Sequence, residues 1–205
     1  MPSAPKDFPS LTTDRLLLRP WRSDDVAAFA ALNADPRVMA LFPTRLTAAE
    51  SEGALARISA HIACHGFGLW AVEAPGVAPF VGAVGLMVPG FRVPFRTRGP
   101  CVEIGWRLAY PFWNRGYATE AARAALAFGF DVVGLREIVS FTTPGNERSW
   151  RVMERLGMTR DPREDFDHPA LPVGHPLRRH LLYRLRAPAR SDSTTGRGIT
   201  SSRAK

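Results

Sequence analysis

The chain has 205 residues, of which 45% are hydrophobic and 22% charged, and its net charge is +8 at pH 7. This length predicts one domain, at most two, and the apolar share excludes a chain that is disordered throughout. No segment reaches the roughly 18 uninterrupted apolar residues of a membrane helix, and the opening MPSAPKDFPS lacks the apolar core of a secretory signal. We therefore expect a soluble, cytoplasmic protein with no membrane partner.

The positive charge is concentrated at the C-terminus, where five basic residues and one acid in the last twenty positions carry half of the net charge. Residues 188–205 are rich in Ser, Thr, Gly and Arg and almost free of apolar side chains, which predicts a disordered basic tail. The alternative is a nucleic-acid tether. We disfavour that partner because no aromatic residues interleave the charges, as single-strand binding requires.

Cysteine and histidine spacing indicates neither a disulfide framework nor a metal site. Cys64 and Cys101 are the only cysteines and follow no CxxC pattern, which favours free thiols in a reducing compartment. Three histidines in the C-terminal third, His168, His175 and His180, lack ligand spacing. We expect no metal.

The chain begins with a predicted strand and two predicted helices. The apolar run DRLLLRPW at 14–21 is typical of a strand, and Ser23 with the two aspartates after it supplies a cap and first-turn acids for a helix. The expected inner stripe of that helix is Val26, Phe29, Ala30 and Leu32. Thr47 and Glu50 form the T-x-x-E pattern of a capping box, which starts a second helix through about Ala63.

A hairpin, a long loop and a strand follow. Residues 67–73 and 80–88 are β-rich and joined by a turn, while 89–100 predict a loop whose three arginines either solvate it or clamp an anionic substrate. In strand 101–108 the side chains alternate between two faces. Val102, Ile104, Trp106 and Leu108 share one face, and Glu103, Gly105 and Arg107 share the other. A glycine at 105 predicts a bulge or a close approach of another backbone.

The remaining elements alternate between helices and strands. A turn, FWNRG, leads into a third helix with small residues at helical spacing, namely Ala118, Ala121, Ala122, Ala125, Leu126 and Gly129. Residues 136–143 predict a strand, Asn146 starts a fourth helix that Gly157 ends, and a Pro-rich loop at 161–176 precedes a last strand at 180–185. The pattern predicts a mixed α+β fold, with about six to seven strands and about four helices, in one domain over 11–187 that follows an extension at 1–10.

The turn before the third helix predicts an anion site. A helix N-terminus offers unpaired N–H groups and a positive dipole end, and Gly116 followed by the small Ala118 lets a phosphate approach closely. The patterns of a nucleotide P-loop and of a dinucleotide fingerprint are both absent. The alternative is that Gly116 only makes a tight turn.

The fourth helix places a polar group on its inward stripe. Ser149 shares that stripe with Val152 and Met153, where an unpaired hydroxyl is costly. One interpretation is local capping between Asn146 and Ser149. The other is that both line a crevice between two strands and face the anion-binding turn.

Two segments, VEIGWRLAYPFWNRGYATEA and VSFTTPGNERSWRVMERLGM, resemble the acetyl-CoA-binding half of the GNAT superfamily of N-acetyltransferases. Together with the start LTTDRLLLRPWRSDDV, they resemble its RimJ/RimL-like branch, which includes ribosomal-protein N-terminal acetyltransferases. The resemblance extends from about Leu11 to Arg186. It implies a mostly antiparallel sheet with splayed strands that form an acyl-CoA cleft, and acetyl-CoA as the acyl donor.

The family's phosphate motif, Q/R-x-x-G-x-G/A, falls on Trp113, Asn114, Arg115, Gly116, Tyr117 and Ala118. Trp113 departs from the usual Gln or Arg and removes a polar side chain, so pyrophosphate binding would rest on the backbone N–H groups of Asn114 through Thr119. The resemblance also implies that the strand edge from Trp106 through Arg107 to Leu108 hydrogen-bonds the pantetheine arm.

The family mechanism implies direct attack of an amine on the thioester, which requires a proton acceptor and a proton donor. Glu103 would accept the amine proton directly or through water, although an exposed or paired strand residue is the alternative. Ser149 would donate to the departing sulfur and Asn146 would orient the arm. Tyr117 lies in the turn and is not expected to reach the sulfur.

The acceptor is left open as a protein N-terminal α-amine or a small-molecule amine. By family analogy its site is built from the early helices and the loops at 89–100 and 161–176. A non-catalytic acyl-CoA-binding or partner-binding module is the alternative function. We expect a monomer or a homodimer.

Overall fold

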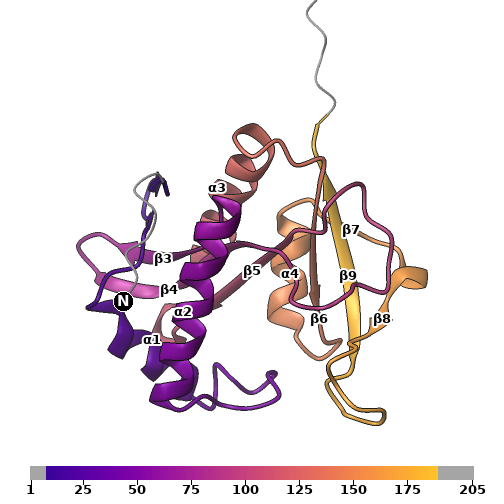
Figure 1. Cartoon of the computed structure of the whole chain (residues 1–205). Helices are drawn as coiled ribbons and strands as arrows, with labels where there is room; N and C mark the ends of the chain where they lie inside the picture. The colour runs from indigo at the N-terminus through magenta and orange to yellow at the C-terminus, as the bar shows by residue number, and fades with distance from the viewer. Residues whose placement is uncertain (1–7, 189–205) are drawn as a thin grey trace, which may run out of the picture.

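The computed structural model describes residues 8–188. Its helices are α1 (Asp25–Ala34), α2 (Ala48–His65), α3 (Tyr117–Asp131) and α4 (Glu147–Arg155), with 3-10 turns at Tyr110–Phe112 and Pro162–Glu164. Its strands are β1 (Leu11–Thr12), β2 (Leu17–Arg19), β3 (Leu69–Ala74), β4 (Ala78–Met87), β5 (Glu103–Leu108), β6 (Glu137–Thr142), β7 (Thr159–Arg160), β8 (Phe166–Asp167) and β9 (Arg179–Arg186). The strand order is β1-β2-β3-β4-β5-β6-β9-β7, and β8 also pairs with β9 (Figure 1).

The mixed, mostly antiparallel sheet with four α-helices is confirmed over residues 8–188. The described sheet has nine strands rather than six to seven. The difference comes from β1, β7 and β8, which have two residues each and are too short to produce a period-2 pattern. Within the described sheet, β5 and β6 form the one parallel pair.

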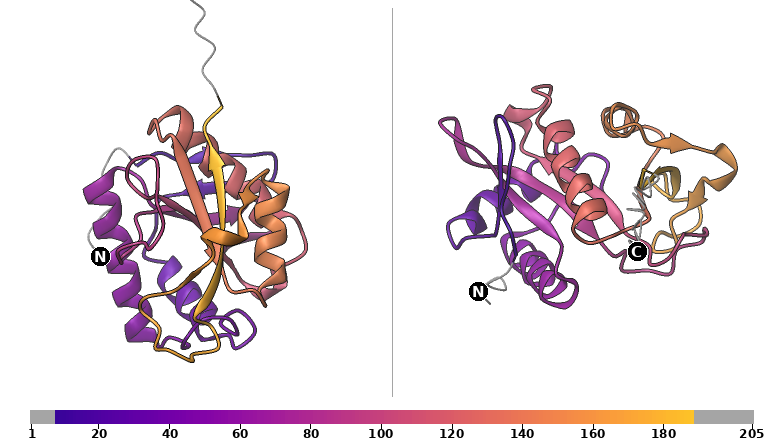
Figure 2. Two further views of the ribbon diagram at one scale, coloured as in Figure 1. Left: turned by 90° about the vertical axis from the view of Figure 1, so that its right-hand side faces the viewer. Right: turned by 90° about the horizontal axis from the view of Figure 1, so that it is seen from above.

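Helices cover both faces of the sheet. The view from above places α2 on one side and α3 and α4 on the other (Figure 2). Five of the six residues predicted at helical spacing on α3 are buried, Ala121, Ala122 and Ala125 fully so, while Ala118 is half-buried. A Cβ at Gly129 would lie 2.8 Å from Ile138 Cδ1, so glycine lets this helix pack closely on the sheet.

The start of α1 differs in detail from the predicted cap. Asp24 occupies the N-cap position without a side-chain cap bond, and the Asp25 carboxylate is buried instead. Asp25 accepts two hydrogen bonds from Arg19, at 2.8 and 2.9 Å, and one from the Arg22 amide. The charged pair therefore fixes where α1 leaves β2.

The capping box predicted at the start of α2 is present. The Thr47 hydroxyl accepts from the Glu50 amide at 3.2 Å, and Glu50 Oε2 accepts from the Thr47 amide at 2.8 Å. We expect Thr47→Ala to lower the free energy of unfolding by about 1 kcal/mol, because the Glu50 amide loses its acceptor and Glu50 Oε2 loses the hydrogen bond from the Thr47 hydroxyl. Urea unfolding would measure it, and Glu50→Gln, which retains both partners, should lose less. An equal loss in both variants would contradict a role for the box.

The residues next to the two termini of the domain were predicted to lie outside its core. Phe8, in the predicted extension, stacks on Trp70 with ring centroids 4.7 Å apart. The predicted basic tail, 188–205, lies outside the described residues except for Pro188. Among residues 8–188, every helix is too short or too polar to cross a bilayer.

The sheet splits between β5 and β6. Their only register pair is Glu103 with Val139, and the Val139 amide donates to the Val102 carbonyl at 2.9 Å. One residue further on, Ser140 Oγ donates to the Ile104 carbonyl at 2.9 Å, a side-chain bond where a strand ladder would use an amide. Beyond this point the strands separate, as the expected splayed pair requires.

Candidate active site

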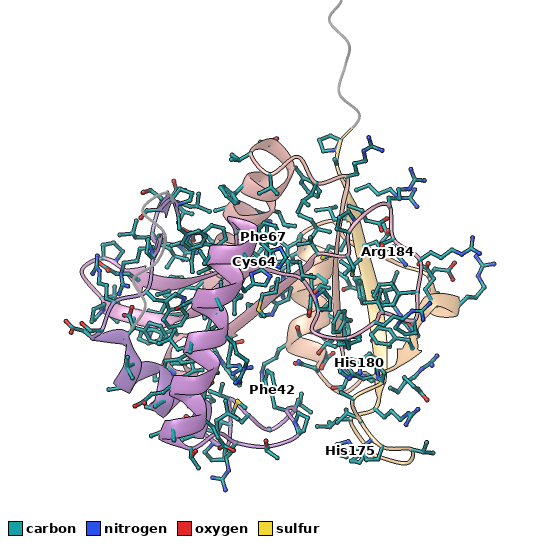
Figure 3. All side chains as sticks on the ribbon, in the orientation of Figure 1. Phe42, Cys64, Phe67, His175, His180 and Arg184 are labelled. Carbon is teal, nitrogen blue, oxygen red and sulfur yellow. The ribbon has the colours of Figure 1, made fainter. Side chains whose placement is uncertain are left out.

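Two cavities meet at the split between β5 and β6. The larger has a volume of about 650 Å³ and the smaller about 290 Å³. Their walls share Leu41, Phe42, Trp106, Arg107, Asn146 and Ser149. Phe42, from the segment after α1, and His180, from β9, lie across the larger cavity from each other (Figure 3). The split thus connects two spaces that a reaction between two substrates could use.

The turn predicted to bind phosphate lines the smaller cavity. Asn114 and Gly116 have left-handed backbones, with φ of 59° and 79°. Within residues 8–188, no carbonyl or side chain accepts from the amides of Asn114 through Thr119. Consecutive free amides at the N-terminus of α3 are the donors that an anion site requires.

Hydrogen bonds from Arg15 and Trp113 hold this turn in place. Arg15 Nη1 donates to the Arg115 carbonyl at 3.0 Å, and Arg15 Nε donates to Glu120 on α3 at 2.7 Å. Trp113 Nε1 donates to the Leu108 carbonyl at 2.7 Å, which ties the turn to the end of β5. Trp113 therefore positions the turn against β5. It does so from the motif position where the family has Gln or Arg.

All but one of the residues predicted to bind acetyl-CoA line the smaller cavity. The lining includes Trp106, Arg107, Leu108, Trp113, Asn114, Gly116, Tyr117, Ala118, Thr119, Asn146 and Ser149. The Arg115 side chain lines neither cavity, and its guanidinium lies 5.7 Å from the centre of the Phe112 ring. Only its backbone belongs to the turn.

Four arginines that the motif did not identify stand around the smaller cavity. Arg37 and Arg151 are paired with Asp35 and Glu147 at 2.7 and 2.6 Å. Arg148 and Arg155 also line it, and no carboxylate among residues 8–188 pairs with either. Arg148, Arg151 and Arg155 lie on α4, where in the sequence they resemble an ordinary solvated helix face, and Arg37 lies in the irregular segment after α1, so no local pattern indicates a site.

The edge of β5 at Trp106 faces the split. The Val102 and Ile104 carbonyls bond to β6, so by strand alternation the main-chain groups of Trp106 are the next to point that way. The register gives them no β6 partner. Gly105 forms no bulge, because its pairing with Gly85 is regular, and a Cβ at 105 would meet nothing within 4 Å. That expectation was wrong: the glycine opens space in the larger cavity.

Glu103 lies in the wall of the larger cavity. No hydrogen bond or ion pair reaches its carboxyl group from residues 8–188, so the paired alternative does not hold. Desolvation raises the pKa of this carboxyl to about 8. A carboxylate near neutral pKa is suited to accept a proton from an amine.

Asn146 and Ser149 line both cavities. The capping interpretation is wrong, because Asn146 occupies the N-cap of α4 without a side-chain cap bond and instead donates from Nδ2 to Thr142 Oγ1 at 2.8 Å. The half-buried Ser149 hydroxyl has no hydrogen-bond partner among residues 8–188.

Tyr117 packs under Arg15, whose guanidinium lies 5.0 Å from the ring centre.

Comparison with known proteins gives the family. A family model described as an acetyltransferase (GNAT) domain matches residues 15–159. An uncharacterized protein of Bacillus subtilis (strain 168), YkkB, is 33% identical over 150 residues, which cover 72% of this chain and 84% of that protein. The FsC-acetyl coenzyme A-N(2)-transacetylase of Aspergillus fumigatus is 32% identical over 158 residues, covering 75% of this chain and 66% of that protein.

Solved structures agree with this fold. The crystal structure of an acetyltransferase from Agrobacterium tumefaciens str. C58 has a TM-score of 0.68 at 30% identity and covers 87% of this chain and 94% of its own. Mycobacterium smegmatis RimJ, in complex with CoA-disulfide, has a TM-score of 0.65 at 22% identity and covers 84% of this chain and 82% of its own, which shows the shared fold alone. By fold, family model and relatives, the chain belongs to the GNAT acetyltransferase family.

Proposed function

We propose that this chain transfers the acetyl group of acetyl-CoA to a primary amine by direct attack, within a domain that spans 11–187. One observation carries the proposal: a turn of unpaired amides is joined, through the split between β5 and β6, to a cavity that contains an unpaired carboxyl group. An anion site supports binding of the donor, and the carboxyl supports deprotonation of the acceptor. The RimJ/RimL-like branch remains our proposal within the family.

The residues of the smaller cavity fit acetyl-CoA, which supplies an activated thioester. The amides of 114–119 would hold the pyrophosphate, with Arg148 and Arg155 adding positive charge. Trp106 would pair its free main-chain groups with the pantetheine amides, as an added strand does. Asn146 would orient the arm where it crosses the split.

Two residues of the chain take part in the proton transfers of the reaction. The acceptor ammonium first loses a proton to Glu103, directly or through one water, and the free amine then forms the C–N bond as the C–S bond breaks. Ser149 donates its hydroxyl proton to the departing sulfur and regains one from solvent, while the second nitrogen proton leaves to solvent. These roles use two unpaired polar groups that face the cavities, the Glu103 carboxyl and the Ser149 hydroxyl.

Calorimetric titration of the full chain with acetyl-CoA and with CoA, followed by thiol release against a panel of primary amines, tests the proposal. Saturable binding with turnover is expected. Binding without turnover on every amine would favour the non-catalytic acyl-CoA-binding module. Absence of binding by folded protein would overturn both.

Ser149→Ala should lower kcat by about 10-fold and change the Kd of acetyl-CoA by less than about threefold, because its hydroxyl acts on the leaving sulfur rather than on the bound donor. Stopped-flow thiol release and calorimetry would measure the two quantities. Ser23→Ala, an exposed site before α1, is the control. An equal loss in kcat and affinity would instead identify Ser149 as a packing residue.

A further inference from the structure

Arg107 is fixed at the junction of the two cavities by residues far away in sequence. Its Nη1 donates to Asn33 Oδ1 on α1 at 2.6 Å, and its guanidinium lies 4.2 Å from the centre of the Phe42 ring. Asn33 is fully buried and donates in turn to Ser51 on α2 at 3.2 Å. The guanidinium is therefore held by a buried network that spans β5, α1 and α2.

The network leaves donors of Arg107 unused. Nε is buried and has no hydrogen-bond partner in the part of the chain that the structure describes. No carboxylate among residues 8–188 forms an ion pair with this guanidinium, and desolvation lowers its pKa to about 10. A desolvated cation with no counter-ion is costly, and a bound anion would remove the cost.

The larger cavity is positively charged and otherwise mainly apolar. Its charged lining residues are Arg57, Arg107 and Glu103, and the last is largely protonated at pH 7 because its pKa is raised to about 8. His168 and His180 also line it, and desolvation lowers the pKa of both, which favours neutral imidazoles. Phe29, Ile58, Met87, Phe141, Leu171 and Leu177 are among the apolar lining residues. Such a wall repels polycationic acceptors.

Glu103 and Arg107 bracket open space on one face of β5. They lie four residues apart on the strand, which separates their Cα atoms by about 13 Å. Between them Gly105 leaves room that a side chain would fill, since a Cβ there has no neighbour within 4 Å. An acceptor with its amine at Glu103 can therefore extend along the strand toward Arg107.

We propose that the acceptor is a small apolar amine that also carries a carboxylate several bonds from its amino group, and that Arg107 binds this carboxylate. The inference rests on the proposed function and specifies its substrate class. The donor phosphates are a poorer match for Arg107, because residues of the turn at 114–119, with its free amides, and Arg148 also line the smaller cavity and would bind them. A donor role is one outcome of the test.

The test compares two acceptors with the same amine environment, 4-(aminomethyl)phenylacetate and its primary amide, using the full chain. We expect kcat/KM for the carboxylate to be about 30-fold higher, which corresponds to about 2 kcal/mol, because only the carboxylate forms a buried charge pair with Arg107. Arg107→Met should reduce the ratio to within about threefold of 1. Arg57→Met, which removes an exposed cation from the same cavity, should reduce it much less.

A second variant and a second measurement separate recognition of the carboxylate from effects on folding and on turnover. Asn33→Asp supplies the missing counter-ion beside Arg107 without removing it, so it should also abolish the preference. Calorimetry with the N-acetylated products of the two acceptors measures recognition without turnover. Circular dichroism shows whether each variant is folded.

Equal kcat/KM and equal binding for the pair would overturn the inference. So would a preference that survives Arg107→Met, or a loss of acetyl-CoA affinity in that variant with the preference intact, which would assign Arg107 to the donor. If every amine were inert while the carboxylate product still bound in an Arg107-dependent way, the proposed function and the acceptor assignment would fail, and only the binding of a carboxylate by Arg107 would stand.

Discussion

Replacing Glu103 with Gln should lower kcat by about 100-fold or more, the usual contribution of a positioned general base. The amide retains the size of the side chain but cannot accept a proton. Acetyl-CoA binding should be little changed, because Glu103 lines the larger cavity and not the smaller one. Thiol release at saturating acetyl-CoA, on any amine that the wild type acetylates, measures the effect.

The pH dependence separates a base from a packing residue. Only ionised Glu103 can accept a proton, so wild-type activity should rise with pH through about 8, the raised pKa of this carboxyl. In Glu103→Gln that limb should disappear, and only the rise caused by the acceptor amine itself should remain. A variant that retained the limb near pH 8 would remove Glu103 as the base.

Stability should change in the opposite direction to activity. Folding raises the pKa of Glu103 from 4.5 to about 8, so the folded state favours the neutral carboxyl. The stability this gives is complete below pH 4.5 and is lost as pH rises through 8. Glu103→Gln should therefore unfold at a higher temperature than wild type at pH 9. Glu52→Gln, an exposed change on α2, should alter neither the melting temperature nor the rate.

Local signals in the sequence were sufficient for much of the fold. The capping box at Thr47 and the small residues of α3 each act within one helix or one helix face. Their patterns can therefore be recognised in the sequence without knowledge of the tertiary structure. The turn at Gly116 was visible for the same reason, since a glycine before a helix is a local feature. Two-residue strands carry no such pattern, and β7 and β8 depend on β9 for their definition.

The polar groups of the site depend on distant segments. Nothing near Arg107 in the sequence shows that Asn33 holds it, because their contact joins residues 74 positions apart. Likewise, whether Glu103 is paired or isolated depends on which strands lie beside β5. The alternation on β5 placed Glu103, Gly105 and Arg107 on one face, but only the tertiary structure shows that this face borders a cavity.

Gly116→Val should weaken acetyl-CoA binding by at least about 100-fold, because two or more charge-assisted hydrogen bonds to phosphate depend on this backbone. Gly116 has a φ of 79°, which a β-branched residue strongly disfavours, and an added Cβ would lie 3.3 Å from Arg15 Nη2. Relief of either problem rotates the amides away from the smaller cavity. Calorimetric titration with acetyl-CoA measures the loss.

Gly134→Val provides a matched control for this substitution. Gly134 lies between α3 and β6 with a φ of 77°, and a Cβ there meets nothing within 4 Å, so the backbone strain is similar while the anion site is untouched. Both variants should lose stability, but only Gly116→Val should lose affinity for acetyl-CoA. Similar Kd values in the two variants would mean that the turn is structural, and the donor site would have to be sought elsewhere. The comparison separates the strain of a left-handed valine from the loss of the amides that bind phosphate.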